Sequence, residues 1–206
     1  MKIVMISDTE GDHRESIIPG GDVLVYGGDI VSYRGVQKFG TYQSQLEDFI
    51  DWLGSQPHSH KIFIGGNHDD VLLAFDKKSL PEGVHYLENE EIVIDGIKFW
   101  GSPNTVEFFG MAFEEPEEKL EEIYKGIPED VDVLITHVPP KGVLDLSSRG
   151  KSCGSMSLAN RLEEISPKVH VFGHTHYSYG SMIHNDTECF NASFQNNRNK
   201  TQTIEI

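Results

Sequence analysis

Cysteine is scarce in this sequence, with only Cys153 and Cys189 among 206 residues. The two lie far apart and form no C-x-x-C pair, which argues against a disulfide framework and predicts two free thiols. Neither cysteine is accompanied by the base and orienting group that mark a nucleophile.

Long apolar runs are also missing, so no transmembrane segment is predicted. The apolar start, Met1 to Ile6, is too short for a signal peptide, and we expect a soluble cytoplasmic protein. Basic residues are few, since 17 Lys and Arg stand against 33 Asp and Glu and the formal net charge is −16. This balance disfavours a membrane-surface partner or long nucleic acid. Much of the acidic excess lies in 88–91 and 114–122, which are expected to be solvated faces.

Internal repeats, linkers and low-complexity segments are absent as well. The length is typical of one domain, so a single domain over 1–206 is expected. A chain of this size buries roughly 70% of its unfolded surface.

What the sequence does contain is a set of apolar runs of strand length. Continuous runs of this kind indicate strands that are buried on both faces, in a sheet covered by helices. The predicted buried strands are Lys2 to Ile6, Val23 to Tyr26, Lys61 to Ile64, Val131 to Ile135 and Val169 to Phe172. Helical spacing predicts helices over 39–53, 70–75, 115–124 and 157–165.

The remaining segments predict shorter elements. Asp95-Gly96 joins two β-prone runs, 91–94 and 97–100, and is a strong hairpin signal. The stretch 102–113 is expected to be an aromatic loop. Further short strands are predicted at 85–87, 179–183, 188–190 and 203–206, so the fold class is α/β.

Each of the five buried strands ends in a residue able to bind metal: Asp8, Asp29, Asn67 with His68, His137, and His174 with His176. Ligands of α/β sheets gather at the carboxyl ends of the strands, so these residues are expected to meet. The alternative is that polar residues follow strands simply because loops are polar. That alternative does not explain the Gly-Gly pairs at 27–28 and 65–66, where small residues would let the backbone pass close to an ion or phosphate.

The same residues form motifs that resemble a known family. Ser7-Asp8-Thr9, Gly27-Gly28-Asp29, G-N-H-D at 66–69, His137 and G-H-T-H at 173–176 are similar to the motifs of the calcineurin-like metallophosphoesterases. W-L-G at 52–54, I-P-E-D-V-D at 127–132 and H-V-F-G-H-T-H at 170–176 resemble the brain-protein 239-like (MPPED-type) branch. The resemblance covers nearly the whole chain.

The resemblance implies a four-layer α/β/β/α sandwich with mixed sheets and two divalent metal ions. Asp29 would bridge both ions, Asp8 and His176 would bind the first, and Asn67, His137 and His174 would bind the second. A hydroxide shared by the ions would attack phosphorus in line. His68 would stabilise or protonate the leaving oxygen, and Asp69 would orient His68.

One position departs from the family pattern, because Glu10 stands where the family has histidine. Glu10 could bind the first metal directly, act through water, or leave the position vacant, and His13 could replace it. We favour Glu10 as a direct or water-mediated ligand. An oxygen-rich first site favours Mn²⁺ or Mg²⁺ over Zn²⁺, with Mn²⁺ preferred and iron or Ni²⁺ as further alternatives.

These features predict a phosphoesterase acting on a small phosphate ester, preferably a phosphodiester or nucleotide. The alternatives are a monoesterase acting on phosphorylated protein or sugar, and a metal-binding scaffold whose catalysis has lapsed, with Glu10 as the first sign of decay. Phe108 and Phe109 could stack on a nucleobase or pack the loop down. Arg149 and Lys151 could bind an anion or be merely solvated. The histidines outside the motifs are expected at the surface or in packing: His58, His60, His85, His170 and His184.

Overall fold

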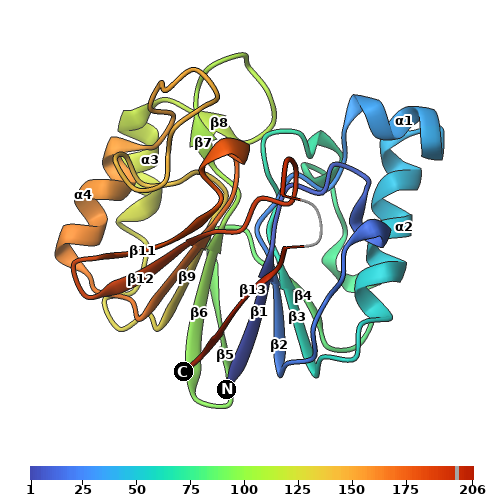
Figure 1. The fold of residues 1–206 in the computed structure, drawn as a ribbon, viewed down its shortest axis with the longest axis horizontal. Helices are drawn as coiled ribbons and strands as arrows, with labels where there is room; N and C mark the ends of the chain where they lie inside the picture. Colours follow the sequence, from blue (N-terminus) through green and yellow to red (C-terminus); the bar gives the residue numbers. More distant parts are fainter. Residues whose placement is uncertain (198–199) are drawn as a thin grey trace.

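Two β-sheets face each other at the centre of the molecule, with helices on the outer side of each (Figure 1). The computed structural model describes residues 1–197 and 200–206. The first sheet has the order β13-β1-β2-β3-β4 and consists of β1 (Lys2–Ile6), β2 (Val23–Tyr26), β3 (His60–Phe63), β4 (Val84–Tyr86) and β13 (Gln202–Glu205). The second has the order β11-β12-β10-β9-β6-β5 and consists of β5 (Glu90–Ile94), β6 (Ile97–Ser102), β9 (Val133–Thr136), β10 (Val169–Phe172), β11 (Gly180–His184) and β12 (Thr187–Asn191). A small parallel pair, β7 (Thr105–Val106) and β8 (Glu114–Glu115), lies apart.

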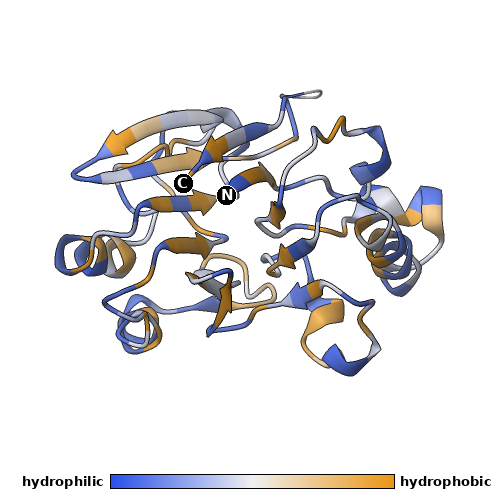
Figure 2. Cartoon of the chain, turned by 90° about the horizontal axis from the view of Figure 1, so that it is seen from below, coloured by the Kyte–Doolittle hydropathy of each residue, from blue (hydrophilic) through white to orange (hydrophobic). Residues whose placement is uncertain are grey.

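Helices cover the two outer faces. α2 (Tyr42–Gly54) packs on the first sheet and α1 (Tyr33–Phe39) packs against α2, while α3 (Glu117–Tyr124) and α4 (Met156–Glu164) pack on the second sheet. Seen along the sheets, the strands are rich in hydrophobic residues, whereas the helices carry hydrophilic residues on their outer surfaces (Figure 2).

The alternation of side chains along each strand explains why the predicted strands are apolar throughout. In β1, Ile3 and Met5 pack into the core between the two sheets, whereas Val4 and Ile6 pack under α2. Neighbouring residues of a strand point to opposite faces, so a sheet covered on both sides needs apolar residues at every position. The predicted four-layer α/β/β/α sandwich with mixed sheets is confirmed.

Parallel pairing positions the functional end of the fold. β1 to β4 run parallel, and so do β6, β9, β10 and β12, while β5, β11 and β13 are antiparallel to their neighbours. The carboxyl ends of the central strands therefore lie together, at the end of the molecule opposite the two termini (Figure 1). The Asp95-Gly96 hairpin is confirmed, with Ile94 pairing with Ile97.

The helix predicted over 39–53 is present as α2, but it begins at Tyr42, and the preceding helix α1 was not predicted. Gly40 ends α1 with a left-handed φ of 88°. Thr41 then caps α2 by accepting a hydrogen bond from the backbone N–H of Ser44. A left-handed glycine followed by a capping threonine stops one helix and starts the next.

Other helix boundaries shift by small amounts. The segment predicted as a helix over 70–75 is a single 3-10 turn, Asp70–Leu72. Pro116 precedes the first turn of α3 and does not lie within it.

No helix within 1–197 or 200–206 is long and apolar enough to cross a membrane.

Candidate metal centre

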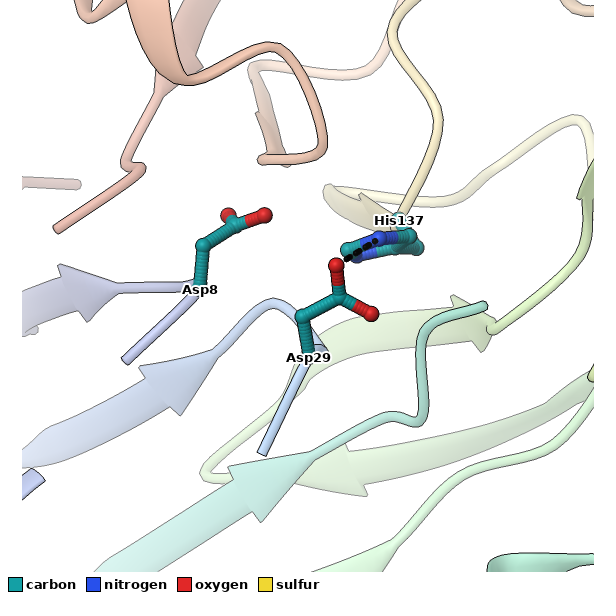
Figure 3. A group of neighbouring side chains, drawn as sticks. All are labelled: Asp8, Asp29 and His137. Carbon is teal, nitrogen blue, oxygen red and sulfur yellow. Dashed lines mark ion pairs between the residues drawn. The ribbon is translucent and has the colours of Figure 1, made fainter. Parts of the chain in front are cut away.

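The loops that follow five strands bring the predicted ligands to one place. Ligand atoms of Asp8, Asp29 and His137 all lie within 4.8 Å of one another (Figure 3). Asp8 follows β1, Asp29 follows β2, and His137 follows β9 in the opposite sheet. The centre therefore lies across the carboxyl ends of both sheets, where α/β sheets hold their ligands.

One group of side chains surrounds Asp8. The His176 Nε2 atom lies 3.2 Å from Asp8 Oδ1 and 3.6 Å from Glu10 Oε1. Asp8 is fully buried and also accepts hydrogen bonds from the backbone N–H of His174 and the hydroxyl of Ser193, both at 2.9 Å. These contacts fix the orientation of the Asp8 carboxylate.

A second group surrounds Asn67. Its Oδ1 atom lies 3.2 Å from His137 Nε2 and 3.0 Å from His174 Nδ1. Asp29 Oδ2 lies 3.2 Å from the same Nε2 atom of His137. The two histidines of the G-H-T-H motif thus contact different side chains, His174 in this group and His176 in the first.

The tautomer of His137 shows that this second group fits a cation. The Nδ1–H of His137 donates to the backbone carbonyl of Gly27 at 2.8 Å. Its Nε2 is left as the atom that faces two acceptor oxygens, those of Asp29 and Asn67. Two oxygens facing Nε2 require positive charge there, either a proton on Nε2 or a bound cation in its place, and an imidazole fixed through its other nitrogen is the usual form of a metal ligand.

The electrostatics of the centre favour positive charge. Burial alone would lower the pKa of His137, but Asp29 raises it to about 10. Burial also opposes protonation of His176, yet Asp8 and Glu10 raise its pKa to about 9. The neighbouring imidazoles in turn hold the pKa of Asp8 and Asp29 below the usual value, against the effect of burial. Buried carboxylates that stabilise adjacent positive charge provide the environment that a divalent cation requires.

His174 differs, because burial lowers its pKa to about 4. It is therefore neutral, as a metal ligand must be. Burial likewise raises the pKa of Glu10 above the usual value.

Four of the predicted ligands adopt left-handed backbone. The φ angles are 55° at Asp8, 49° at Glu10, 57° at Asp29 and 63° at His174. Left-handed geometry costs roughly 1–2 kcal/mol for a residue with a side chain. Hydrogen bonds between the loops offset this cost, among them Asp8 N–H to Gly28 O at 2.9 Å and Glu10 N–H to Asp29 O at 3.1 Å. Strain of this kind concentrates at functional sites.

The glycines of the motifs serve close packing between loops. A Cβ at Gly28 would lie 2.4 Å from Gly65 O, and one at Gly66 would lie 2.3 Å from Asp29 Oδ1. At Gly173 it would lie 2.0 Å from Asp8 Oδ2. The space that a Cβ would need is filled by neighbouring loops and ligand side chains, so these glycines let the backbone pass close to the candidate ligands.

His68 lies at the edge of the centre. Its backbone N–H donates to Asp29 Oδ1 at 3.0 Å, and its Nε2 atom lies 4.0 Å from Asp29 Oδ2. The side chain is 38% exposed, which leaves the ring accessible to a ligand in solution.

The expected contact from Asp69 to the His68 ring is wrong. Both oxygens of Asp69 accept from backbone N–H groups, those of Ile30, Val31 and Gly66, at 2.9 to 3.1 Å. Asp69 thereby ties the loop after β2 to the loop after β3. Burial, together with the charge of Asp29, raises its pKa to about 7.

The structure brings Glu10, and not His13, to the centre. The Glu10 side chain is 14% exposed and faces His176. His13 is buried between Phe39, Phe49 and Trp52 and contacts Asp48 through Nε2 at 2.8 Å. His13 therefore points away from the candidate ligands.

Three residues near the C-terminal end hold the candidate ligands and their loops in place, and they were not predicted from the sequence. Asn191 donates through Nδ2 to the carbonyls of Gly173 and Thr175 and so holds the G-H-T-H loop. Ser193 orients Asp8, and Gln195 donates to the carbonyl of Thr9 at 3.0 Å. The available signal was the polar residues at alternate positions 191, 193 and 195, at the end of a β-prone segment and directly after it.

The remaining expectations concern residues outside the centre. His58 and His170 are buried packing residues, as expected for histidines outside the motifs. Both cysteines are free thiols, with Cys189 buried and Cys153 half-buried.

Comparison with known proteins agrees with this geometry. The family model described as calcineurin-like phosphoesterase matches residues 1–178. The chain is 33% identical over 223 residues to metallophosphoesterase domain-containing protein 1 of Homo sapiens, covering 93% of this chain and 65% of that protein. It is 30% identical over 222 residues to UPF0046 protein K07C11.7 of Caenorhabditis elegans, covering 100% of this chain and 74% of that protein.

Among solved structures, the protein TT1561 of Thermus thermophilus shares the fold. The TM-score is 0.66 at 13% identity, over 92% of this chain and 88% of that one. The expected resemblance to the MPPED-type branch is confirmed by the relatives. The chain belongs to the calcineurin-like phosphoesterase family.

Proposed function

We propose that the protein hydrolyses a small phosphate ester, preferably a phosphodiester or nucleotide, with two divalent metal ions bound at the candidate centre. The observation that supports this proposal is the His137 Nε2 atom, which faces oxygens of Asp29 and Asn67, where a bound cation can replace the proton that these oxygens otherwise hold on the ring. Mn²⁺ is the preferred ion, because carboxylates dominate the first group of ligands.

The contacts support a proposal of two ligand sets. Asp8, Glu10 and His176 would hold the first ion, and Asn67, His137 and His174 would hold the second. Asp29 would belong to both sets, since its carboxylate lies beside His137 and its ligand oxygen lies within 4.8 Å of that of Asp8. When bound, such ions supply an activated water molecule and neutralise charge on the phosphate oxygens.

His68 would act on the leaving group. Its accessible ring lies near Asp29 without belonging to either set, so it can donate a proton to the departing oxygen. Asp69 would contribute indirectly, by holding the loop that carries Asn67 and His68 against the loop that carries Asp29.

Hydrolysis of ethyl p-nitrophenyl phosphate and of p-nitrophenyl phosphate tests the proposal. Metal-stripped protein is assayed with each divalent ion added back. We expect the diester to be hydrolysed best with Mn²⁺ and metal binding to be kept in His68→Ala. This variant should lower kcat by about 10²–10⁴-fold for a dialkyl phosphate, whose departing alkoxide needs a proton, and by less for the p-nitrophenyl esters. His184→Ala, a histidine on β11 paired with Glu163, serves as the control and should retain full activity.

The proposal would be contradicted if neither the wild-type protein nor His68→Ala hydrolysed the esters with any ion. In that case the centre would be a metal-binding scaffold without catalysis. Activity restored best by Zn²⁺ would instead contradict the choice of Mn²⁺ alone.

A further inference from the structure

Phe108 and Phe109 form an exposed aromatic pair in the loop between β7 and β8. Their side chains are 68% and 76% exposed, and the two rings meet edge to face with centroids 4.1 Å apart. The alternative that they pack the loop down is therefore wrong. Exposing two adjacent phenylalanines is unfavourable in water, and apolar patches of this kind commonly mark a binding surface.

The loop that carries the pair is held in place by one carboxylate. Glu114 Oε2 accepts hydrogen bonds from four consecutive backbone N–H groups, those of residues 108–111, at distances from 2.7 to 3.1 Å. A loop fixed at four successive amides presents its side chains in a defined direction. The hydrogen bonds to Glu114 therefore fix the conformation of the loop and the direction of the two exposed rings.

The loop also contacts the candidate metal centre. Asn67 uses its Oδ1 atom for His137 and His174, and its Nδ2–H donates to Met111 Sδ at 3.4 Å. Met111 therefore connects the aromatic loop directly to a proposed ligand of the second ion.

A second loop, which also follows a strand of the second sheet, meets the aromatic pair. Lys151 Nζ lies 5.4 Å from the centroid of the Phe108 ring. Its loop follows β9 and is organised by the buried Asp145, which accepts from the backbone N–H of Gly142 and from the hydroxyl of Ser152. Figure 1 shows both loops at the same end of the molecule as the centre.

Between this second loop and the G-H-T-H loop lies a pocket of about 220 Å³. Ser147, Cys153, His174, His176 and Tyr177 are among the residues that line it. The pocket thus adjoins the proposed ligands His174 and His176, and the loop that lines it also carries Lys151, which lies beside the Phe108 ring. An anionic ester with a flat ring matches this set of groups, because aromatic faces stack on rings and the lysine attracts the phosphate charge.

We propose that the Phe108–Phe109 pair is the specificity element of the centre and selects phosphate esters whose retained, non-leaving group is a flat aromatic group. Glu114 acts as a positioning residue for the pair. The inference rests on the proposed phosphoesterase function and adds the class of group that the substrate carries.

Three p-nitrophenyl phosphodiesters test the proposal, with ethyl, benzyl or thymidine 5′ as the second group. All three release the same leaving group and carry the same charge, so differences in kcat/KM report on the second group. We expect the wild type to favour the benzyl and thymidine esters, and Phe109→Ala to raise KM for these two about tenfold, the size of one lost stacking contact. KM for the ethyl ester should not change.

Two comparisons sharpen the assay. Val93→Ala removes an exposed apolar side chain from β5 and should alter none of the three esters. A thymidine ester favoured over the benzyl ester identifies the group as a nucleoside, and equal values identify a simple aromatic ring. Both results support the aromatic pair as the specificity element. Equal changes in all three esters, or no change in Phe109→Ala, would overturn it.

Glu114 is tested through the separation of KM from kcat. Glu114→Ala should raise KM for the aromatic esters as Phe109→Ala does, with kcat retained. Glu114→Gln should restore much of the preference, because the amide oxygen can still accept from the loop. A Gln variant no better than the Ala variant, or a loss confined to kcat, would remove Glu114 from this role.

A direct binding measurement separates this inference from the proposed function. Calorimetric titration with ethyl phosphate, benzyl phosphate and thymidine 5′-monophosphate is performed on Mn²⁺-treated protein. If no ester is hydrolysed, the proposed function fails. A preference for the aromatic ligands that is lost in Phe109→Ala still supports the aromatic pair, and equal affinities for all three overturn it.

Discussion

At the scale of single residues, Asp69 shows how a motif residue can serve the site without touching a ligand. Its carboxylate accepts three backbone hydrogen bonds from two loops. Asp69→Asn replaces one of the accepting oxygens by an NH₂ group, which would face an amide donor. We expect a loss of about 1–3 kcal/mol in the free energy of unfolding and weaker metal binding.

Urea unfolding and metal titration of this variant check the prediction. Asp70→Asn, at the exposed neighbouring position, is the matched control and should resemble the wild type. A stability of Asp69→Asn equal to that of the control would contradict the assigned role.

The buried side chain of His170, which is not a proposed metal ligand, should make the stability of the fold sensitive to acid. It is fully buried, its Nε2 contacts Thr136 Oγ1 at 2.8 Å, and its Nδ1 has no hydrogen-bond partner among the described residues. Burial lowers its pKa to about 3, against about 6.5 in the unfolded chain. The folded state binds fewer protons between these values, so the contribution is complete above about pH 6.5 and is lost as the pH falls.

The size follows from the linkage of about 1.4 kcal/mol per pH unit. Between about pH 7.5 and pH 4.5, the wild type should lose roughly 2–3 kcal/mol more than His170→Leu. Urea unfolding in the presence of a chelator measures this difference and keeps metal binding out of the comparison. Parallel pH profiles of the two proteins would show that His170 is not responsible.

At the scale of elements, two glycines with similar backbone angles differ in their surroundings. One lies where the loops at the strand ends pack closely together, and the other lies in open space. Gly28 and Gly40 have φ angles of 98° and 88°. A Cβ at Gly28 would clash with Gly65 O and His137, whereas a Cβ at Gly40 would meet nothing within 4 Å. Gly40→Ala should therefore cost only the strain of a left-handed alanine, about 1–2 kcal/mol.

Gly28→Ala should cost more than Gly40→Ala and should also abolish tight metal binding, because the loops that hold Asp29 and His137 must move apart. Thermal unfolding and metal titration of the two variants separate strain from clash. Equal metal binding by both would show that close packing of these loops is not needed.

Some of the helices and strands could be predicted from the sequence and others could not. Buried strands such as β1 were predictable, because burial on both faces leaves a continuous apolar run. The break at Gly40 was missed, since apolar spacing alone does not show where a glycine adopts a left-handed φ. The pairing of β7 with β8 joins segments whose contact depends on tertiary structure and leaves no local periodicity.

For the site, residue types at the strand ends were enough to predict which side chains meet, since parallel strands bring their ends together. They could not predict the partners of Asp69 or the support from Asn191 and Ser193. Those contacts join residues far apart in the chain and depend on loop geometry. The exposure of Phe108 and Phe109 likewise follows from the hydrogen bonds of Glu114, which composition does not encode.

At the scale of the whole molecule, the candidate centre joins the two sheets. Asp8, Asp29 and Asn67 follow strands of the first sheet, and His137, His174 and His176 follow strands of the second. A cation bound by both sets should therefore stabilise the packing of one sheet on the other. At an ion concentration of about 100 times Kd, the stabilisation is about 2.7 kcal/mol.

Removal of metal by a chelator should accordingly lower Tm by roughly 5–10 °C for a chain of this length. Differential scanning calorimetry with Mn²⁺ and with chelator measures the shift. His184→Ala should show the same shift as the wild type, because His184 lies outside both ligand sets. An unchanged Tm on chelation of the wild type would contradict the stabilisation.

Calorimetric titration of metal-stripped protein with Mn²⁺ tests the central claim most directly. The account predicts two equivalents for the wild type, one tight equivalent for His176→Ala, and no tight binding for Asp29→Ala, because Asp29 alone belongs to both ligand sets. A wild type that binds no Mn²⁺, or an Asp29→Ala protein that still binds two equivalents tightly, would contradict it.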